Sequence, residues 1–499
     1  MNATTIHNNQ ALALSRIPCL DYEAFRLDNL ALLDQPERHC VHYFGVAQAD
    51  GVRLFCCIAD DATHEIQVSS SLVDPSVERP SLTATHANFE PFERQLHEQF
   101  GVRYTDHPWL KPFRYAFDRA DQTSMMAEYP FLHSESEELH EVGVGPIHAG
   151  IIEPGHFRFI CNGEQIMHLE IQLGYQHRGI ESLMVAKKKL LERTTLAENC
   201  AGDTTVGHTT AFVNLWESLC GYETDTSLQY ARTVALELER MAIHTGDMAA
   251  MCADMGYQLG NAVYGRLRTP LVNFFQEWCG NRLAKGLIRA GKSNYPFTEV
   301  LAGRLLQLLE AYEADFEEMT QVFFALPSAL SRMEKTGVVT YEQVLEIGTV
   351  GMAARMSGLN RDIRASHPCN LYGSVIKHEP IIKHHGDVYA RVRIRREEIR
   401  QSIGYLRQLM QEVPPTPIYA DVPLNPGASL FVLSLVEGWR GEICHVALTD
   451  STGNLAAYTI KDPSNHNWMA LALAVRNNEI SDFPICNKSF NLSYSGHDL

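Results

Sequence analysis

The side chains best suited to chemistry gather in one short polar segment near the middle of the chain. Residues 197–208 read AENCAGDTTVGH and place Cys200 and His208 close together in sequence. A thiolate and an imidazole are both ligands for transition metals, and the same pair can act as nucleophile and general base. We call this segment the central turn. Its residue types leave two chemistries open, a metal site and a metal-free hydrolase built on Cys200 and His208.

The cysteines outside the central turn add no metal site of recognisable local spacing. The chain has 12 cysteines, at positions 19, 40, 56, 57, 161, 200, 220, 252, 279, 369, 444 and 486. None forms the CxxC pair from which zinc and iron–sulfur sites are commonly built. In a long chain with scattered cysteines we expect reduced, mostly buried thiols.

Helical patterns on both sides must position the central turn. Apolar spacing predicts helices over 180–196, 205–219, 226–251, 298–324, 387–412 and 468–476. A hairpin is predicted from strands at 156–161 and 165–174 around the Asn162-Gly163 pair. Two further strands are expected within 428–450, separated by a glycine-rich turn.

The first part of the chain has a different pattern. Apolar runs at 41–48, 51–59 and 65–73 predict strands, and 89–100 predicts a helix that Gly101 ends. The acidic, aperiodic residues 119–142 predict a solvated linker. We therefore expect an α+β protein with a small mixed α/β domain over 1–118 and a larger, mainly helical domain with peripheral β-hairpins over 143–499.

Composition excludes several classes of partner. The 499 residues include 42 Lys and Arg against 60 Asp and Glu, a net charge of −18. Binding to nucleic acid or to anionic lipid through charge needs clustered basic residues, so neither is expected. No apolar run reaches the length of about 18 residues that a membrane span needs, and the first residues lack a signal-peptide pattern. A cytoplasmic protein that can dock on a membrane partner is expected.

Several segments, in order along the chain, resemble one known family. GPIHAGIIEPGHFRF at 145–159 and LGYQHRGIE at 173–181 are similar to the opening of the large subunit of membrane-bound group 4 nickel–iron hydrogenases and of the homologous core subunit of respiratory complex I. ELERMAIHTGD at 237–247, residues 336–368 and EGWRGE at 437–442 resemble later family motifs. Residues 93–111 resemble the small complex I subunit that formate-hydrogenlyase-type hydrogenases carry fused at the N-terminus.

This resemblance implies a subunit of a membrane-associated, ion-translocating oxidoreductase, peripheral at the cytoplasmic face of the inner membrane. It implies a small iron–sulfur subunit and antiporter-like and other integral membrane subunits as partners, and no nucleic acid. Electrons would reach a quinone or another two-electron acceptor from an iron–sulfur cluster on the neighbouring subunit. The alternative is a non-catalytic structural or coupling subunit of the same kind of complex.

The metal ligands of the family find no match here. Family members hold nickel and iron with four thiolates, two from a CGxC motif before a histidine and two from a C-terminal CxxC. Aligned on Glu198 and His208, the first two ligand positions fall on Ala201 and Thr204, and the segment SFNLSYSGHD, residues 489–498, gives Ser493 and Gly496. We call residues 489–498 the tail.

None of these four side chains is a nickel ligand. The resemblance therefore predicts that the nickel–iron centre and hydrogenase activity are absent. Cys200 is one residue out of register and Cys486 lies seven residues before Ser493, so a simpler metal site on these two cysteines is the alternative.

The vacated cavity is expected between residues 146–156, the central turn and the tail. We expect the catalytic residues to be Glu153, His148, His208, Asp362 and Arg364, and the cavity lining to be Ala201, Thr204, Ser493, Tyr494, Gly496 and His497. Further polar candidates are His156, Asp203 and Asp498. The tyrosine that complex I places in the equivalent turn has no counterpart, and residues 145–157 follow the hydrogenase pattern, so the chain resembles a hydrogenase-derived subunit that lost its metal separately.

Each candidate also has a structural interpretation. Glu153 resembles a proton-relay carboxylate, or it bonds a backbone N–H; His148 and His208 serve the site, or they are satisfied by backbone carbonyls. Asp362 and Arg364 match the family's D-x-R motif or form a structural ion pair. Four further polar residues share one helical face and predict a buried polar network: Glu239, Arg240, His244 and Asp247.

Overall fold

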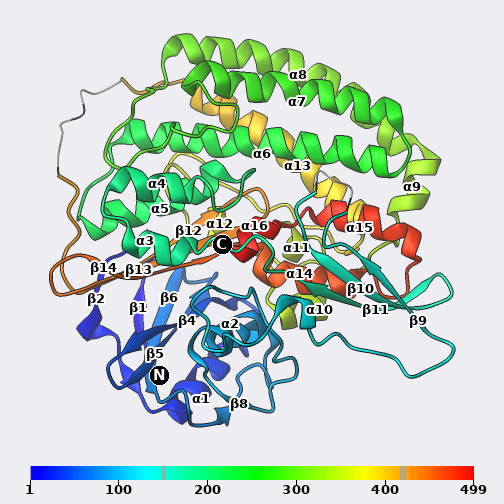
Figure 1. Cartoon of the computed structure of the whole chain (residues 1–499). Helices are drawn as coiled ribbons and strands as arrows, with labels where there is room; N and C mark the ends of the chain where they lie inside the picture. The colour runs from blue at the N-terminus through cyan, green and yellow to red at the C-terminus, as the bar shows by residue number, and fades with distance from the viewer. Residues whose placement is uncertain (1, 149–151, 416–418, 420–422) are drawn as a thin grey trace.

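A β-rich N-terminal part and a bundle of long helices lie on opposite sides of a central sheet and the C-terminal segment (Figure 1). The computed structural model describes residues 2–148, 152–415, 419 and 423–499. The α+β class expected from the sequence is confirmed.

The N-terminal part is built on an antiparallel meander. It consists of β4 (Arg38–Gln48), β5 (Gly51–Asp60) and β6 (Glu65–Val73), with β1 (Thr4–Ile6) and β3 (Cys19–Leu20) both pairing with β6. Helices α1 (Tyr22–Leu32) and α2 (Glu90–Phe100) cover it. Gly101 ends α2 at φ 72°, a left-handed conformation that favours glycine, so the three predicted strands and the helix are confirmed.

A second sheet joins the two ends of the chain. Its order is β14 (Leu455–Lys461), β13 (Glu442–Thr449), β12 (Leu430–Glu437) and β2 (Leu12–Ala13). Phe55 and Val68 of the meander share an apolar core with Phe431 and Val446 of this sheet. Residues 1–118 therefore pack directly on the C-terminal strands, and the division of the chain at 119–142 stays a prediction.

A three-stranded sheet projects at one side of the helices (Figure 1). It contains β9 (His140–Val144), β10 (His156–Asn162) and β11 (Gln165–Gln172), and the predicted turn at Asn162-Gly163 joins the last two. The last residues of the predicted linker, 140–142, overlap the first strand of this sheet. Residues 140–142 are the start of an edge strand, because β10 supplies backbone partners for them.

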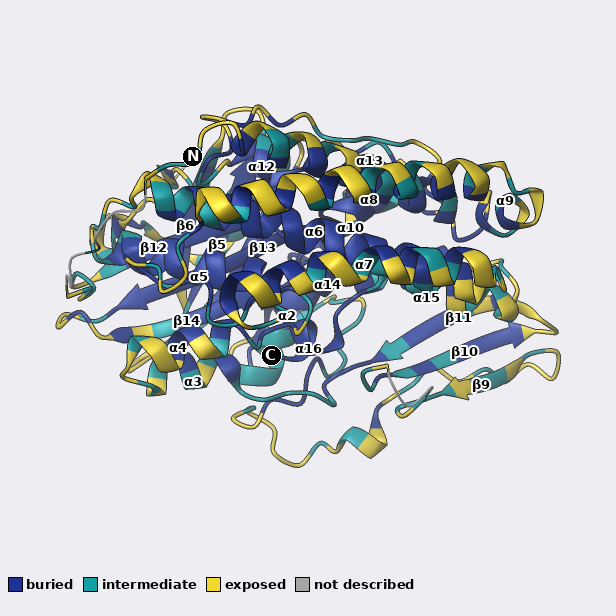
Figure 2. Cartoon of the chain, turned by 90° about the horizontal axis from the view of Figure 1, so that it is seen from above, coloured by how far each residue is buried: buried dark blue, intermediate teal, exposed yellow. Residues whose placement is uncertain are grey.

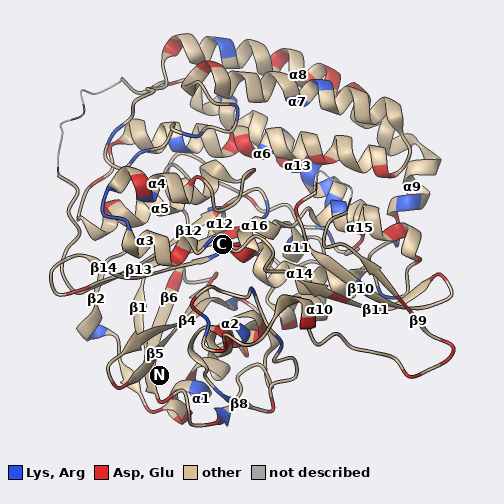
Figure 3. Ribbon diagram, in the orientation of Figure 1, with Lys and Arg blue, Asp and Glu red and all other residues tan. Residues whose placement is uncertain are grey.

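The helical side of the molecule contains two short helices followed by longer ones. They are α3 (Ile180–Ala186), α4 (Leu190–Ala197), α5 (Thr205–Leu219), α6 (Thr226–Asp254), α7 (Gln258–Cys279), α8 (Glu299–Ala325) and α13 (Val388–Leu409). Figure 2 shows α6 buried beneath α7 and α8, whose outer faces are exposed. Charged residues of both signs lie along α7 and α8 (Figure 3). A polar face on α6 therefore meets protein, whereas the charges of α7 and α8 reach water.

Two of the helix predictions need correction. Residues 180–196 are two helices rather than one, since Lys187 is extended at φ −68° and ψ 143° and ends α3. Helix α7 was not predicted, and its interior Pro270 explains why, because a proline normally interrupts a helical pattern.

Short elements complete the fold. They are β7 (Arg79–Pro80), β8 (Tyr104–Thr105), α9 (Pro327–Met333), α10 (Tyr341–Ile347), α11 (Met352–Arg355), α12 (Ile363–Ser366), α14 (Ser464–Ala474), α15 (Phe483–Phe490) and α16 (Tyr494–Asp498), with 3₁₀ turns at Leu14–Arg16, Ala87–Phe89, Met126–Glu128 and Ile480–Asp482. Within the described ranges, no helix is both long and apolar enough to cross a membrane.

Candidate functional site

The central turn and the tail, far apart in sequence, lie side by side at the middle of the molecule. Two arginines hold them together. Arg178 donates from Nη2 to the carbonyl oxygens of Cys200, at 3.0 Å, and Ser495, at 2.6 Å. Arg440, between β12 and β13, bonds Thr204 Oγ1 at 3.0 Å and also donates to the backbone oxygen of Asn491. The register inferred from sequence alone therefore joins two segments that do meet in space.

The four positions aligned with metal ligands are closed to solvent. Ala201 and Thr204 are 0% exposed and Ser493 is 1% exposed. The Ser493 hydroxyl accepts the backbone N–H of Gly496 at 2.8 Å. A Cβ atom added to Gly496 would lie 2.6 Å from Asp462 Oδ2, closer than real contacts allow. The space for a fourth thiolate is therefore taken by a carboxylate.

The donor set does not fit a nickel–iron centre. Alanine and glycine offer no ligand side chain, and a neutral hydroxyl is a poor match for a metal that selects soft thiolates. Among the residues that the structure describes, no group of three or more His, Cys, Asp or Glu side chains is placed to hold a metal ion. We derive no chemistry through such a centre, and its absence stays a prediction.

His208 is the most strongly connected residue of the central turn. Its Nε2 lies 3.0 Å from Asp462 Oδ2 and its Nδ1 lies 3.0 Å from His445 Nε2. The other ring nitrogen of His445 bonds the hydroxyl of Tyr458 at 2.6 Å. All four side chains are buried. We call this row of four residues the His208 chain; its partners are side chains rather than the backbone carbonyls considered above.

The charge state of the His208 chain follows from its surroundings. Burial alone would lower the pKa of His208, but Cys200 and Asp462 together raise it to about 10. Burial, with a contribution from His208, holds the pKa of His445 well below its usual value. A protonated His208 donates to Asp462 and to a neutral His445, whose own N–H then points to Tyr458. The His208 chain thus consists of a buried ion pair between His208 and Asp462, extended by the neutral side chains of His445 and Tyr458.

The two cysteines proposed as alternative ligands are not placed as a reactive site. Cys200 is 0% exposed, and its thiol lies 3.6 Å from the carbonyl oxygen of Leu196. Cys486 lies against Gly337 and is equally buried. A hydrolase needs a nucleophile that substrate can reach, so the burial of Cys200 and His208 argues against that chemistry.

Glu153 and His148 lie at the tail, on the two sides of a segment outside the described residues. Glu153 is partly exposed rather than buried, and its carboxylate is 3.5 Å from the backbone N of Ser495. The ring of His148 packs 5.6 Å from Phe157 and 6.4 Å from Tyr494. The structure thus places both residues beside the tail, where Glu153 has the backbone contact that its structural interpretation requires.

Three further candidate residues lie in the tail, and all three are buried. Tyr494 is buried, with its ring 4.9 Å from that of Trp468. Asp498 accepts the backbone N–H groups of Gly174 and Gln176, both at 2.8 Å, which explains its position structurally. His497 lines a small cavity of about 140 Å³ between the N-terminal part and β11. The other side chains around this cavity include Glu90, Arg94, Trp109, Phe113, His168 and Trp468.

Asp362 and Arg364 belong to a separate cluster of buried charges. The cluster contains Glu237, Arg240, His244, Arg355, Asp362, Arg364, His378, Glu398 and Glu437, and all of these side chains are buried. We call it the Glu398 network. Arg364 pairs with Asp362 at 2.7 Å and with Glu398 at 2.8 Å. The structural ion pair expected from the D-x-R motif is therefore present, as part of a larger set.

Helix α6 contributes to this network, as its polar face predicted. His244 Nε2 lies 2.6 Å from Glu398, and Arg240 donates to the carbonyl oxygen of Glu437 at 2.9 Å. Asp247 pairs separately with Arg395 at 3.0 Å. Glu239 faces α5 instead, where it accepts the first backbone N–H groups of that helix, Val206 at 2.7 Å among them. Because these backbone N–H groups have no partner within the helix, Glu239 fixes the start of α5 by accepting them.

Two carboxyl groups of this region have perturbed proton affinity. Burial and then the nearby Asp362 raise the pKa of Glu437 to about 8, despite opposing arginines. Burial likewise raises the pKa of Glu239 to about 8. Glu398 behaves oppositely: burial opposes its ionisation, but Arg355 and Arg240 hold its pKa well below the usual value. Burial thus raises the pKa of both Glu437 and Glu239 above the usual range of a carboxyl group.

Sequence reasoning did not single out Glu398 or Glu437 as site residues. Glu437 ends the apolar strand β12, and Glu398 lies on a helix rich in charged residues. The available signal was Glu437 itself, an acidic residue closing an otherwise apolar run. Segment 437–442 connects the Glu398 network to the central turn, since it carries Glu437 at one end and Arg440, which pairs with Asp203, near the other.

Comparisons with known proteins agree with this architecture. Residues 254–429 match the family model described as "Respiratory-chain NADH dehydrogenase, 49 Kd subunit". The chain is 27% identical to hydrogenase-4 component G of Escherichia coli, over 76% of this chain and 65% of that protein. It is 30% identical to an NADH-quinone oxidoreductase subunit of Dehalococcoides mccartyi, over 66% of this chain and 90% of that protein.

A solved structure shares the fold. It belongs to the membrane-bound sulfane sulfur reductase, an archaeal respiratory membrane complex, with a TM-score of 0.68 at 20% identity, covering 74% of this chain and 100% of that one. The chain spans about two thirds of the length of its Escherichia coli hydrogenase relative. By sequence and fold, the chain belongs to the family of complex I 49-kDa core subunits and the large subunits of related membrane-bound hydrogenases.

Proposed function

We propose that the chain is a core subunit of a membrane-associated, ion-translocating oxidoreductase complex, and that it carries no nickel–iron centre. Electrons come from an iron–sulfur cluster on a neighbouring small subunit, and integral membrane subunits move the ion. Family membership supports the setting. The side chains at Ala201, Thr204, Ser493 and Gly496 support the loss of the metal, because they supply no thiolate.

Within that complex, the geometry supports a coupling role better than acceptor reduction at the former metal position. The observation that carries this choice is the closure of the site: Thr204 is 0% exposed, Arg440 spans from it to Asn491, and Asp462 fills the space beside Gly496. A quinone head group needs an open pocket with an apolar wall. The side chains here leave a buried ion pair instead.

In a coupling role, the buried charged groups would respond to a change of charge on a neighbouring cluster. A change of charge on a neighbouring cluster acts strongly on groups held in a low-dielectric interior. Glu437, whose pKa is about 8, can take up or release a proton in response. Segment 437–442 then connects that change to the central turn through Arg440. The chain would relay redox state as protonation and ion-pair rearrangement.

Acceptor reduction remains the second candidate, favoured by the cavity at His497. Its walls include Trp109, Phe113 and Trp468, and its volume is about 140 Å³. Ligand pockets usually measure roughly 300–1,000 Å³. This cavity would therefore have to widen before it could hold a head group.

The two roles separate when electron transfer and ion translocation are measured on the same complex. We would replace His208→Gln and Glu437→Gln in the intact complex, with Glu310→Gln on the exposed face of α8 as the control. A coupling role predicts that acceptor reduction continues while the ions moved per electron fall at least tenfold. Loss of acceptor reduction in His497→Gln, a residue of the cavity wall, would support the second candidate instead. Stoichiometric nickel in the purified complex would overturn the proposal.

A further inference from the structure

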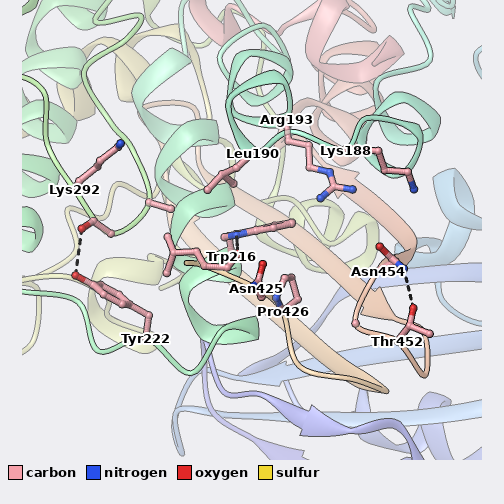
Figure 4. Close-up of a pocket in the computed structure, with 14 residues that line it drawn as sticks. Lys188, Leu190, Arg193, Trp216, Tyr222, Lys292, Asn425, Pro426, Thr452 and Asn454 are labelled. Atoms are coloured by element: carbon pink, nitrogen blue, oxygen red, sulfur yellow. Dashed lines mark hydrogen bonds between the residues drawn. The ribbon is translucent and has the colours of Figure 1, made fainter. Parts of the chain in front are cut away.

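A second cavity is lined by none of the residues of the central turn, the tail, the His208 chain or the Glu398 network. It is bounded by α4, the end of α5, the loop at 290–292, residues 424–426 and the turn between β13 and β14 (Figure 4). Its volume is about 520 Å³, within the range of roughly 300–1,000 Å³ found for small-molecule sites. The proposed function does not use this cavity.

Arg193 of α4 is the distinctive residue of its wall. The residue is only 5% exposed, and its guanidinium lies 4.9 Å from the ring centre of Trp216. Its Nε donates to the carbonyl oxygen of Met184 at 2.8 Å. Among the described residues, no carboxylate lies within salt-bridge distance of it, although Glu192 attracts it at longer range, and burial lowers the pKa of Arg193. A bound anion would therefore meet a guanidinium whose terminal nitrogens are not engaged by a carboxylate of the described residues.

The rest of the lining suits a phosphate-bearing molecule. Lys188 and Lys292 lie on either side of Trp216, so that three basic residues face one cavity of a chain whose net charge is −18 (Figure 4). Neutral hydrogen-bonding groups come from Asn425, Thr452 and Asn454. Trp216 and Tyr222 add aromatic surface. A guanidinium binds phosphate oxygens in a bidentate manner, and lysines add charge.

We propose that this cavity binds a soluble organic phosphate of nucleotide size, whose phosphate groups contact Arg193 and Lys188 and whose ring packs near Trp216 and Tyr222. Two features select this class. Inorganic phosphate would leave most of 520 Å³ unfilled, and an uncharged ring compound would leave Arg193 without a counter-ion. The site therefore favours a ligand that carries both a phosphate group and a ring.

The test measures binding of four probes to the purified full-length chain by calorimetry at low salt. The probes are ADP, pyrophosphate, inorganic phosphate and adenosine. We expect ADP to bind most tightly, pyrophosphate several-fold more weakly, and adenosine not at all. Raising the salt concentration should weaken ADP binding, since charge supplies much of the affinity. No binding of ADP or pyrophosphate at roughly millimolar concentration would overturn the proposal.

Variants then locate the site. Arg193→Gln should weaken ADP binding at least tenfold, because it removes the charge and the bidentate guanidinium that would bind the phosphate. Lys188→Gln should weaken it several-fold. Arg266→Gln, on the exposed surface of α7, is the control and should bind as the unmodified chain does. If Arg193→Gln does not fold, Arg193→Lys retains charge but not the bidentate geometry. Unchanged ADP affinity in whichever Arg193 variant folds would overturn the assignment.

Discussion

The Cβ atom that Gly496 lacks would lie 2.6 Å from Asp462 Oδ2, and the same oxygen lies 3.0 Å from Nε2 of His208. The ion pair of His208 with Asp462 therefore depends on the absence of a side chain at position 496. A larger residue at 496 displaces Asp462, and displacement of Asp462 leaves a buried imidazolium without its partner.

Gly496→Ala should therefore destabilise the protein by about 1–3 kcal/mol, the usual effect of overpacking a buried site. Urea unfolding measures this change in the free energy of unfolding. The matched control is Gly202→Ala in the central turn, where an added Cβ meets nothing within 4 Å. That substitution should change stability by less than about 0.5 kcal/mol. Equal effects of the two substitutions would contradict the crowding at position 496.

The ion pair of His208 predicts a pH-dependent effect of mutation. Because Cys200 and Asp462 outweigh burial and raise the pKa of His208 to about 10, the stability from its charged form is complete below the unfolded pKa of about 6.5 and is lost as pH rises towards 10. His208→Gln should therefore lower stability by about 3–5 kcal/mol near pH 6, and by much less near pH 10. Urea unfolding at both values tests this; a difference independent of pH would refute the charged state.

Glu437 predicts a pH dependence that a mutation should remove. Burial and Asp362 raise its folded pKa to about 8, so the folded state keeps a proton that the unfolded state releases near pH 4.5. Stability from this group is present below about pH 4.5 and falls as pH rises to 8. Glu437→Gln should thus leave the melting temperature at pH 5 nearly unchanged and raise it by several degrees at pH 9.

The control for Glu437 is Glu310→Gln on the exposed face of α8, which should shift neither melting temperature appreciably. A Glu437→Gln protein whose melting temperature falls at pH 9 would show that the carboxylate is ionised and serves as a partner of Arg355. Glu437 would then not be the exchangeable proton site of the Glu398 network.

Local sequence patterns predicted many of the helices and strands. They did not predict which distant residues would pair. Helix α5 has the bounds expected from its apolar run, and Gly101 ends α2 as expected. The pair of Asp362 and Arg364 was accessible because only one residue separates them. Glu398 and Glu437 join the same network from distant segments, and no sequence period records which buried charges will meet.

The central turn shows the same limit of prediction from sequence. Alignment of motifs placed Thr204 and Ser493 in one site, and the structure brings their segments together through Arg178 and Arg440. What fills the site was not predictable, because His445 lies on β13 and Asp462 just after β14, outside both motifs. Closure of a site depends on the packing of all its neighbours, which a motif does not specify.

Arg178 is one of the two arginines that hydrogen-bond both the central turn and the tail. Its guanidinium donates to the carbonyl oxygens of Asn199, Cys200 and Ser495. Hydrogen bonds to a charged donor contribute about 1.5–3 kcal/mol each, and buried carbonyls left without donors add a penalty. Arg178→Ala should therefore loosen the tail locally before the whole protein unfolds.

Hydrogen exchange followed by mass spectrometry measures this loosening directly. In Arg178→Ala, amides of residues 493–499 should exchange at least tenfold faster, while those of α6 change little, because local opening leaves the helical core intact. The control is Arg266→Ala, whose ion pair with Asp315 is exposed and contributes at most about 1 kcal/mol. If the amides of the tail exchange at the original rate in Arg178→Ala, the prediction is wrong. The contacts of Arg440 and Asp498 would then hold the tail against the central turn without Arg178.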